Sequence, residues 1–230
     1  HRKIDECYQL KGATISQEAD ERYYVVLLYS CEEPVNEIRK AESVIGLDFS
    51  MKELYVDSNG NRAAYPHFFS KAQKKLAREQ RKLSRCVKGS RNYVRQKKKV
   101  ARCHEKIRSQ RRDYLHKLSR RITDQYDIVA VEDIDMKAMS QCLHFGKSVQ
   151  DNGYGMFRDM LDYKLAWKGK ELVKVDRFFP SSKKCSKCGK IKKELKLSER
   201  VYRCLCGNEM DRDRNAAINI REEARRMLAA

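Results

Sequence analysis

Short apolar runs separated by polar turns predict the strands in the first part of this chain. The runs at 10–16 and 23–29 are rich in β-branched and aromatic residues, and they predict two strands of a small barrel whose remainder is missing. The runs at 44–49 and 54–56 predict a second pair of strands. Ser58-Asn59-Gly60, which follows them, is typical of a hairpin turn.

Between residues 71 and 121 the apolar positions recur at about 3.6-residue spacing, which predicts two long amphipathic helices. Gly89-Ser90-Arg91-Asn92 interrupts this spacing and predicts the turn of a helical hairpin. One face of each helix is expected to pack, and the other to present Lys and Arg. The apolar positions are Ala72, Leu76, Leu83, Val100, Cys103, Ile107, Tyr114, Leu118 and Ile122.

Apolar strands return after the predicted helices, at 128–132 and 172–175. The stretch from Met156 to Trp167 between them predicts a helix that ends near Gly169. An order of strands, helices, strand, helix, strand and helix is typical of an α/β fold. A chain of 230 residues is long enough for one main domain with small appendages.

The positive charge of the chain is concentrated in the predicted helices. The formal net charge is +19, and residues 71–121 hold 21 Lys or Arg against three acids, a net charge of +18. Such a stripe repels itself unless a polyanion neutralises it, so it predicts nucleic-acid binding. The alternative is a solvated helix face, which would carry more acids at four-residue spacing. The expected nucleic-acid-binding residues are Lys74, Lys75, Arg78, Arg81, Lys82, Arg91, Arg95, Lys97, Lys98, Lys99, Arg102, Arg111 and Arg112.

The sequence has no apolar signal core and no long uncharged apolar run, which argues against secretion and against membrane spanning. Because it begins at His1 without an initiator Met, we expect a fragment of a longer protein. We expect its cysteines to stay reduced, without disulfides, in a cytoplasmic protein.

Four cysteines form the most specific pattern in the sequence. Cys185 and Cys188 are separated by two residues, and Cys204 and Cys206 by one. Two such pairs are typical of turns that converge on one structural zinc ion, although the second pair is one residue shorter than usual. The alternative is a chance cluster of thiols. The other cysteines, Cys7, Cys31, Cys86, Cys103 and Cys142, show no such pairing.

Two carboxylates end apolar runs, where a buried charge requires a partner or a metal ion. In the first run Asp48 shares a strand face with Gly46, and in the later run Glu132 shares a face with Ala130. These small neighbours leave room beside each acid. The alternative for either acid alone is an exposed strand end.

A third acid is expected on the last helix. If this helix begins near Asp211, Asp213 lies on the same face as Ala217 and Ile220, which is the buried one. Asp211 lies nearly opposite and has a sufficient role as an N-cap, although it stays an alternative to Asp213. Asp48, Glu132 and Asp213 could hold two Mg²⁺ or Mn²⁺ ions that hydrolyse a phosphodiester bond. The zinc site would then fix how the last helix docks.

These motifs, in this order, resemble the TnpB proteins of insertion sequences, which are relatives of the type V CRISPR effectors. The resemblance covers about residues 10 to 225 and includes the basic helices. It implies an RNA-guided DNA endonuclease with a RuvC domain of RNase H fold, whose partners are a guide RNA and target DNA. The matching segments are Val44–Asp48, Val131–Ile134, Pro180–Gly189 and Asp211–Ile220.

The resemblance also implies roles and domains. It assigns catalysis and magnesium to Asp48, Glu132 and Asp213, and zinc to Cys185, Cys188, Cys204 and Cys206. The implied domains are the terminal strands of a wedge-like β-barrel at 1–40, a RuvC nuclease domain at 41–178 with a basic helical hairpin at 71–122, a zinc ribbon at 179–210 and a final RuvC helix at 211–230. The chain departs from the family at Phe49-Ser50. Compared with a full member of the family, we expect a longer N-terminal recognition region to be missing from it. A separate N-terminal half or a second copy is therefore an expected partner.

Three alternatives stay open. A guide-dependent DNA-binding repressor would have lost catalytic acids, which are intact here. A transposition accessory protein with a zinc ribbon would bind nucleic acid without cleavage. A guide-independent nuclease of RNase H type would share the chemistry and differ only in what directs it.

Overall fold

The structure is a computed structural model, and it describes residues 8–30, 43–136, 138, 151, 153–196 and 198–229. The chain forms two compact units. One contains His1–Val35 and Phe68–Asp113, and the other contains Asn36–His67 and Tyr114–Ala230. Among the described residues, no helix combines the length and apolar character that crossing a bilayer requires.

In the first unit, β1 (Gln9–Gln17) and β2 (Tyr23–Ser30) form an antiparallel hairpin with a register shift between Leu10 and Gly12. The two predicted strands are confirmed. Within the described residues they form a two-stranded sheet of their own, so the barrel stays a prediction. Most of the large apolar side chains of this hairpin are exposed, among them Ile15, Val26 and Leu28.

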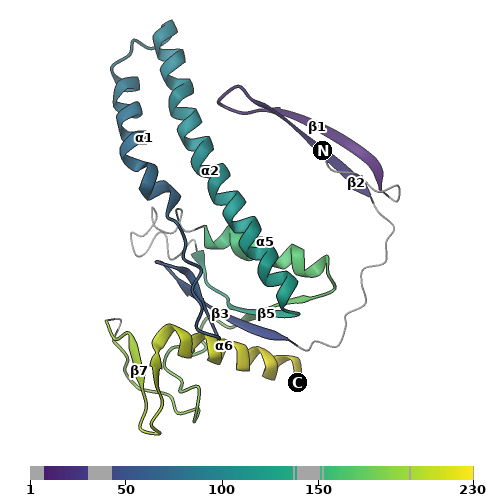
Figure 1. Cartoon of the computed structure of the whole chain (residues 1–230), viewed down its shortest axis with the longest axis vertical. Coiled ribbons are helices and arrows are strands. Elements are labelled where there is room, and N and C mark those ends of the chain that lie inside the picture. Colours follow the sequence, from purple (N-terminus) through teal and green to yellow (C-terminus); the bar gives the residue numbers. More distant parts are fainter. Residues whose placement is uncertain are drawn as a thin grey trace. The chain divides into compact units, whose positions relative to one another are not determined.

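The predicted helical hairpin is also confirmed, as α1 (Phe68–Ser84) and α2 (Arg91–Gln125), of which α2 continues into the second unit (Figure 1). The turn ends at Ser90, one residue before α2, because the Ser90 hydroxyl accepts a hydrogen bond from the amide of Tyr93 at 3.1 Å and caps the helix. In this unit the helices bury Leu76 and Ile107, as their spacing predicts. They also bury Glu79, whose carboxylate accepts a hydrogen bond from Gln96 at 2.8 Å.

The second unit contains a four-stranded mixed sheet in the order β4-β3-β5-β6. Its strands are β3 (Val44–Ser50), β4 (Leu54–Asp57), β5 (Ile128–Glu132) and β6 (Glu171–Val175). The pair β3–β4 is antiparallel, and the pairs β3–β5 and β5–β6 are parallel. The sheet confirms the α/β fold class that the order of apolar runs predicts.

Helices cover both faces of this sheet (Figure 1). On one face, α6 (Arg212–Ala229) packs Ile220 and Ala224 against Ala130 and Val173. Its backbone approaches β3 so closely that a Cβ atom at Gly46 would lie 2.1 Å from the carbonyl oxygen of Ala217. Because only glycine fits there, Gly46 sets the distance between α6 and the sheet.

The opposite face of the sheet is covered by α5 (Tyr154–Ala166), which matches the predicted helix within two residues. Tyr154 lies against Phe49 with ring centroids 4.6 Å apart, and Phe157 stacks on Tyr55 at 5.5 Å. Phe49 and Tyr55 belong to the face away from α6, as strand alternation requires. The sheet is therefore the middle of three layers.

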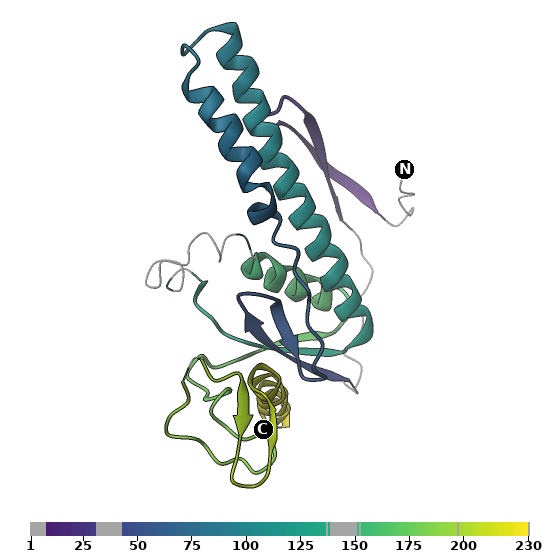
Figure 2. The same ribbon diagram turned by 60° about the vertical axis from the view of Figure 1, so that its left-hand side comes forward.

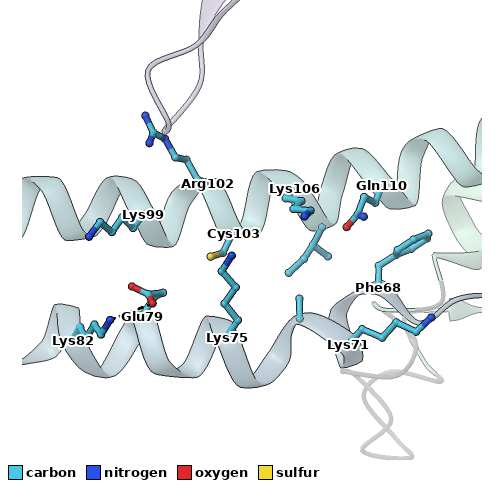
Figure 3. Close-up of a pocket in the computed structure, with 12 residues that line it drawn as sticks. Phe68, Lys71, Lys75, Glu79, Lys82, Lys99, Arg102, Cys103, Lys106 and Gln110 are labelled. Carbon is cyan, nitrogen blue, oxygen red and sulfur yellow. Dashed lines mark ion pairs between the residues drawn. The ribbon is translucent and has the colours of Figure 1, made fainter.

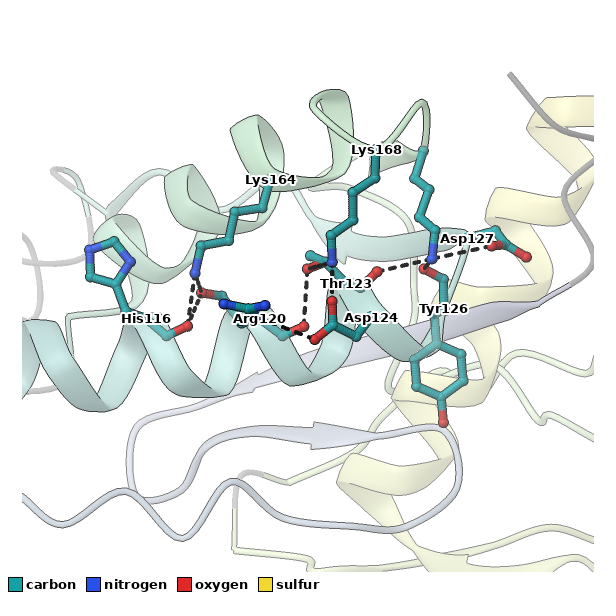
Figure 4. A network of polar contacts seen from close by, with 10 residues as sticks. His116, Arg120, Thr123, Asp124, Tyr126, Asp127, Lys164 and Lys168 are labelled. Atoms are coloured by element: carbon teal, nitrogen blue, oxygen red, sulfur yellow. Dashed lines mark hydrogen bonds and ion pairs between the residues drawn. The ribbon is translucent and has the colours of Figure 1, made fainter. Parts of the chain in front are cut away.

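Three lysines fasten the last turns of α2 (Figure 4). Lys164 of α5 donates to the hydroxyl of Ser119 at 2.7 Å, and Lys168 donates to Thr123 at 3.0 Å and pairs with Asp124. Lys170 donates to the carbonyl of Tyr126 at 3.0 Å. Lysine side chains near the C-terminus of a helix can donate hydrogen bonds to its last carbonyls, and their positive charge interacts favourably with the helix dipole. Burial, with repulsion from Lys168 and Arg120, lowers the pKa of Lys164.

Between β6 and α6 the chain forms a small ribbon, with β7 (Val201–Arg203) and β8 (Glu209–Asp211) paired antiparallel. Figure 2 shows this ribbon beside α6. Tyr202 is fully buried in it and donates a hydrogen bond to the carbonyl of Lys183 at 3.0 Å.

Candidate active site and metal centre

The three predicted acids lie on the face of the sheet that α6 covers. In the parallel pair β3–β5, Leu47 is opposite Val131, so Asp48 and Glu132 are the next residues on neighbouring strands. Both share a face with small residues, Gly46 and Ala130, that pack under α6. Asp213 lies in the first turn of α6, with its side chain 18% exposed.

Electrostatic repulsion connects these acids. Burial, followed by repulsion from Asp213 and Glu132, raises the pKa of Asp48 well above its usual range. Burial also raises the pKa of Glu132, and a hydrogen bond from the Ser181 hydroxyl at 3.4 Å partly offsets this. Asp213 pairs with Arg212, whose guanidinium lies 3.3 Å from its carboxylate. Negative charge therefore accumulates at one place that a divalent cation would stabilise.

The choice between Asp211 and Asp213 is supported by their contacts. The carboxylate of Asp211 accepts a hydrogen bond from the amide of Arg214 at 3.0 Å, which confirms the predicted N-cap. The same side chain pairs with Arg62 at 2.9 Å. Asp211 thus has a structural role, whereas Asp213 lies on the buried sector with Ala217 and Ile220.

The loop after β6 borders these acids and was not predicted as part of the site. Val175, its last strand residue, is paired with Glu132. Asp133, which follows Glu132, pairs with Arg177 of the loop at 3.2 Å and with Arg158 of α5 at 3.4 Å. Sequence reasoning missed these contacts because a loop carries no periodicity that would reveal its partner.

The donor set fits hard divalent ions, because all three side chains offer carboxylate oxygens. In the described part of the chain, the four cysteines are the one group of three or more such side chains that is placed to hold a metal ion, and the three acids do not form a second group of this kind.

The structure brings the four predicted cysteines together. All four Sγ atoms lie within 4.8 Å of one another, with Cys185 and Cys206 3.6 Å apart and Cys188 and Cys204 also 3.6 Å apart. Each pair lies in a tight turn that ends in glycine. The amide of Gly189 donates to the carbonyl of Cys185 at 2.9 Å, and that of Gly207 to Cys204 at 3.0 Å. Both glycines have positive φ, of 75° and 82°. The shorter second pair therefore reaches the same point.

The pKa values of these thiols favour a bound cation. Although burial favours the neutral thiol, the amides of Cys188 and Lys187 and the side chain of Asn208 lower the pKa of Cys185 to about 6. Although the amide of Asn208 favours the thiolate at Cys206, burial and the neighbouring sulfurs raise the pKa of Cys206 to about 11. Four sulfurs this close cannot all ionise without a metal ion, and tetrahedral zinc is the ion that such a set prefers.

Two buried asparagines of α6 connect the first cysteine turn to this helix. Asn215 donates to the carbonyl of Lys184 at 2.8 Å and accepts from the amide of Ser186 at 3.0 Å. Asn219 donates to the carbonyls of Ser181 and Lys184 at 2.8 and 2.7 Å. Sequence reasoning missed both residues. Their four-residue spacing, beside the buried stripe of α6, is the signal that could have identified them.

The predicted basic residues lie on α1 and α2 of the first unit, and all are exposed except Lys98 and Arg111, which are half-buried. Four of them, Lys75, Lys82, Lys99 and Arg102, line a groove of about 750 Å³ between the helices (Figure 3). Lys71 and Lys106 also line it and were not predicted. The floor contains Cys103, Ile107 and the buried Glu79. Lys98 and Arg78 are paired with Glu21 and Glu79.

The other cysteines that the structure describes show no comparable grouping. Cys86 and Cys103 are unbridged thiols, and Cys7, Cys31 and Cys142 lie outside the described residues.

Two family models match the chain. The OrfB_IS605 model, described as "Probable transposase", matches residues 27–143, and the model described as "Cas12f1-like, TNB domain" matches residues 154–220. The second match contains the four cysteines and Asp213, and the first contains Asp48 and Glu132.

Curated relatives are similar over nearly the whole chain. A protein of Streptomyces pristinaespiralis named "Putative RNA-guided DNA endonuclease" is 36% identical over 95% of this chain and 54% of its own length. "Putative RNA-guided DNA endonuclease InsQ" of Escherichia coli (strain K12) is 33% identical over 96% of this chain and 58% of its own length. The chain thus spans between half and two thirds of these relatives.

A solved structure has a similar fold. It is titled as the cryo-EM structure of the Cas12f1-sgRNA-target DNA complex, and one of its chains matches with a TM-score of 0.57 and 18% identity. The match covers 96% of this chain and 68% of that one.

Proposed function

Because this chain belongs to the OrfB_IS605 family, we propose that it is the nuclease portion of a TnpB-type RNA-guided DNA endonuclease. The family membership confirms the resemblance that the sequence motifs indicate. The observation that carries the proposed activity is the placement of Asp48 and Glu132 on the face of the sheet under α6, where burial and repulsion from Asp213 and Glu132 raise the pKa of Asp48. An isolated DNA-binding protein has no need of three crowded acids.

In this proposal the sheet with its two helical layers is a RuvC domain of RNase H type. Residues 41–178 and 211–230 form this domain, with the basic hairpin at 71–122, and residues 179–210 form a zinc ribbon. Residues 1–40 belong to a wedge-like barrel that the rest of a longer protein, a separate N-terminal half or a second copy would complete.

The proposed chemistry is metal-assisted hydrolysis of a phosphodiester bond. Two Mg²⁺ or Mn²⁺ ions, when bound, would activate a water molecule and stabilise the leaving oxygen. Asp48 and Glu132 would hold them from adjacent strands, and Asp213 from the first turn of α6. Ser181 would keep the Glu132 carboxylate oriented through the hydrogen bond at 3.4 Å.

Zinc would have a structural role in this site. Held by Cys185, Cys188, Cys204 and Cys206, it would fix the first cysteine turn, which Asn215 and Asn219 fasten to α6. Because Asp213 is two residues before Asn215 on this helix, the zinc ribbon would set the position of one catalytic ligand.

The partners in this proposal are a guide RNA and target DNA, and the protein would act at the nucleoid. The net charge of +18 on residues 71–121 supports this, since neutralising phosphates releases their counterions. Six of the cationic side chains in this segment line the groove between α1 and α2 together with one buried acid, Glu79, and this excess of positive charge suits a phosphate backbone.

The direct test is cleavage of target DNA in Mg²⁺ by the chain together with its copurifying RNA and, where required, the remaining part of the longer protein. Asp48→Ala, Glu132→Ala and Asp213→Ala should each reduce cleavage by more than about 100-fold while DNA binding persists. Asp211→Asn is the matched control, because Asn also caps helices and this variant should cut normally. Normal cutting by all three alanine variants would exclude the site.

A further inference from the structure

We infer that Phe178 is a stacking platform for one nucleobase of the nucleic-acid strand that enters the acid cluster, which consists of Asp48, Glu132 and Asp213. By stacking on this base, Phe178 positions the nucleic-acid strand. The inference rests on the proposed nuclease function and assigns a substrate contact to a residue outside the acids. It concerns the loop that joins β6 to the zinc ribbon.

This loop is fixed to the acid cluster on both sides of Phe178. Immediately before it, Arg177 pairs with Asp133, the residue after Glu132, at 3.2 Å. Three residues after it, the Ser181 hydroxyl donates to the carboxylate of Glu132 at 3.4 Å. Phe178 therefore belongs to a loop that directly contacts a proposed metal ligand, Glu132.

The turn that presents Phe178 is internally hydrogen-bonded. The Phe178 amide donates to the carboxylate of Asp176 at 2.7 Å, and the Phe179 amide to the carbonyl of Asp176 at 3.0 Å. The Ser181 amide donates to the carbonyl of Phe179 at 2.7 Å. These hydrogen bonds define the path of the backbone, so the loop determines where the side chain of Phe178 begins.

The two consecutive phenylalanines have opposite environments. Phe179 packs against the core under α6, and the ammonium of Lys184 lies 5.2 Å from its ring centroid. Phe178 is 86% exposed. A hydrogen-bonded turn that partly buries one ring and leaves the next in water makes an aromatic face available on the loop that contacts Glu132.

A single nucleobase suits this ring better than a protein surface does. The residues before Phe178 in the loop, Asp176 and Arg177, are exposed and charged, so this stretch of chain offers one exposed apolar ring, which is far below the size of a protein interface. Base stacking on an aromatic side chain requires only one ring and tolerates any base. Arg177, the preceding residue, and Arg158 both pair with the one carboxylate of Asp133, so this group of three side chains has a net positive charge. A single-stranded nucleic acid therefore has the matching chemistry.

The test uses tryptophan fluorescence, because the chain has one tryptophan, Trp167. In the double variant Trp167→Phe, Phe178→Trp, the only indole is at the proposed platform. We expect a single-stranded oligothymidine to quench its emission saturably, in low salt and without divalent ions. The unaltered chain is the control, since Trp167 is also exposed, at 75%, but packs edge-on against Tyr163 and should respond weakly.

Affinity provides the second readout. Phe178→Ala and Phe178→Leu should each weaken binding of the same oligonucleotide by about 5- to 100-fold, and Phe178→Tyr should retain it, because stacking needs an aromatic ring rather than an apolar one. An oligonucleotide with abasic sites should lose the dependence on Phe178.

The outcomes separate this inference from the proposed function. Unchanged affinity of Phe178→Ala, or emission that saturating oligonucleotide leaves unchanged, would overturn the platform. Platform behaviour without any Mg²⁺-dependent cleavage would support the stacking contact and contradict the nuclease proposal. Failure of the unaltered chain to bind single strands would contradict both.

Discussion

The two units of this protein differ in how much of their structure they complete themselves. In the second unit the central strands and their helices bury residues such as Leu47, Val131 and Ile220 almost fully. In the first unit the β1–β2 hairpin leaves Ile15 and Val26 more than half exposed, and the helices carry most of the net charge. The second unit, which has the proposed chemistry, is therefore held in its folded structure by its own core. The unit with the proposed nucleic-acid surface leaves apolar and charged side chains exposed, which a partner would cover and neutralise.

The largest difference in stability between the two units is expected from substitutions at two glycines, Gly46 and Gly12. Gly46→Ala would force a Cβ atom to within 2.1 Å of the Ala217 carbonyl, so we expect a loss of about 3 kcal/mol or more in the free energy of unfolding of the second unit. Gly12→Ala in the first unit meets no atom within 4 Å and should change stability by less than about 0.5 kcal/mol. Hydrogen exchange resolved by segment would measure each unit separately. Equal losses for the two variants would show that α6 does not pack as closely as described.

The next largest effect concerns the cysteine ribbon and α6. Chelation with confirmed loss of zinc should lower the melting temperature, increase hydrogen exchange around Cys185 and in the first half of α6, and reduce cleavage. Unaltered melting and cleavage after zinc loss would contradict the coupling.

The asparagines test the same coupling without removing the metal. Asn219→Ala leaves the buried carbonyl of Ser181 without its side-chain donor and removes one of two donors to the carbonyl of Lys184, so it should cost about 1–3 kcal/mol. Asn59→Ala is the control, since this exposed side chain donates only to Tyr126 and its loss should cost less than about 0.5 kcal/mol. Calorimetry of the zinc-loaded proteins would compare the two. Similar costs would refute the role of Asn219.

A smaller, pH-dependent effect is expected at the acids. Because the pKa of Asp48 is raised in the folded protein, its ionisation destabilises the protein progressively as the pH rises above about 4. In zinc-loaded protein without Mg²⁺ or Mn²⁺, Asp48→Asn should therefore be stabilising at pH 8, and this advantage should vanish near pH 3. Each kcal/mol gained would raise the melting temperature by about 2–4 °C. A variant less stable than the parent at pH 8 would contradict the crowding of the acids.

The smallest effects are expected in the first unit, where single cations contribute little. Lys75→Ala or Arg102→Ala, in the groove, should each lower the salt dependence of nucleic-acid binding by about one unit of slope. Lys74→Ala and Lys97→Ala, which lie outside the groove, are the matched variants and should have weaker effects. A filter-binding series in salt would compare them. Identical slopes for all four would assign the binding to the whole stripe and not to the groove.

Much of this structure could be predicted from the sequence because its periodic elements obey simple rules. Strand alternation places Asp48 beside Gly46, and helix periodicity selects Asp213, since both rules act within one element. The N-cap role of Asp211 is local too, and its contact with Arg214 confirms it. The contacts of Asn215, Asn219 and Ser181 could not be predicted, because each connects segments whose relative position depends on packing. The buried Glu79 was missed for the same reason, since its partner Gln96 is on another helix.

The central claim is that Asp48, Glu132 and Asp213 form one site for divalent ions. Binding of Mn²⁺ to the zinc-loaded protein, followed by electron paramagnetic resonance, tests it most directly because it requires neither guide nor target. We expect the zinc-loaded protein to bind two Mn²⁺ ions. Asp213→Asn should bind at least one ion fewer, and Asp211→Asn should bind both. Full Mn²⁺ binding by Asp213→Asn, with loss in Asp211→Asn, would contradict the claim.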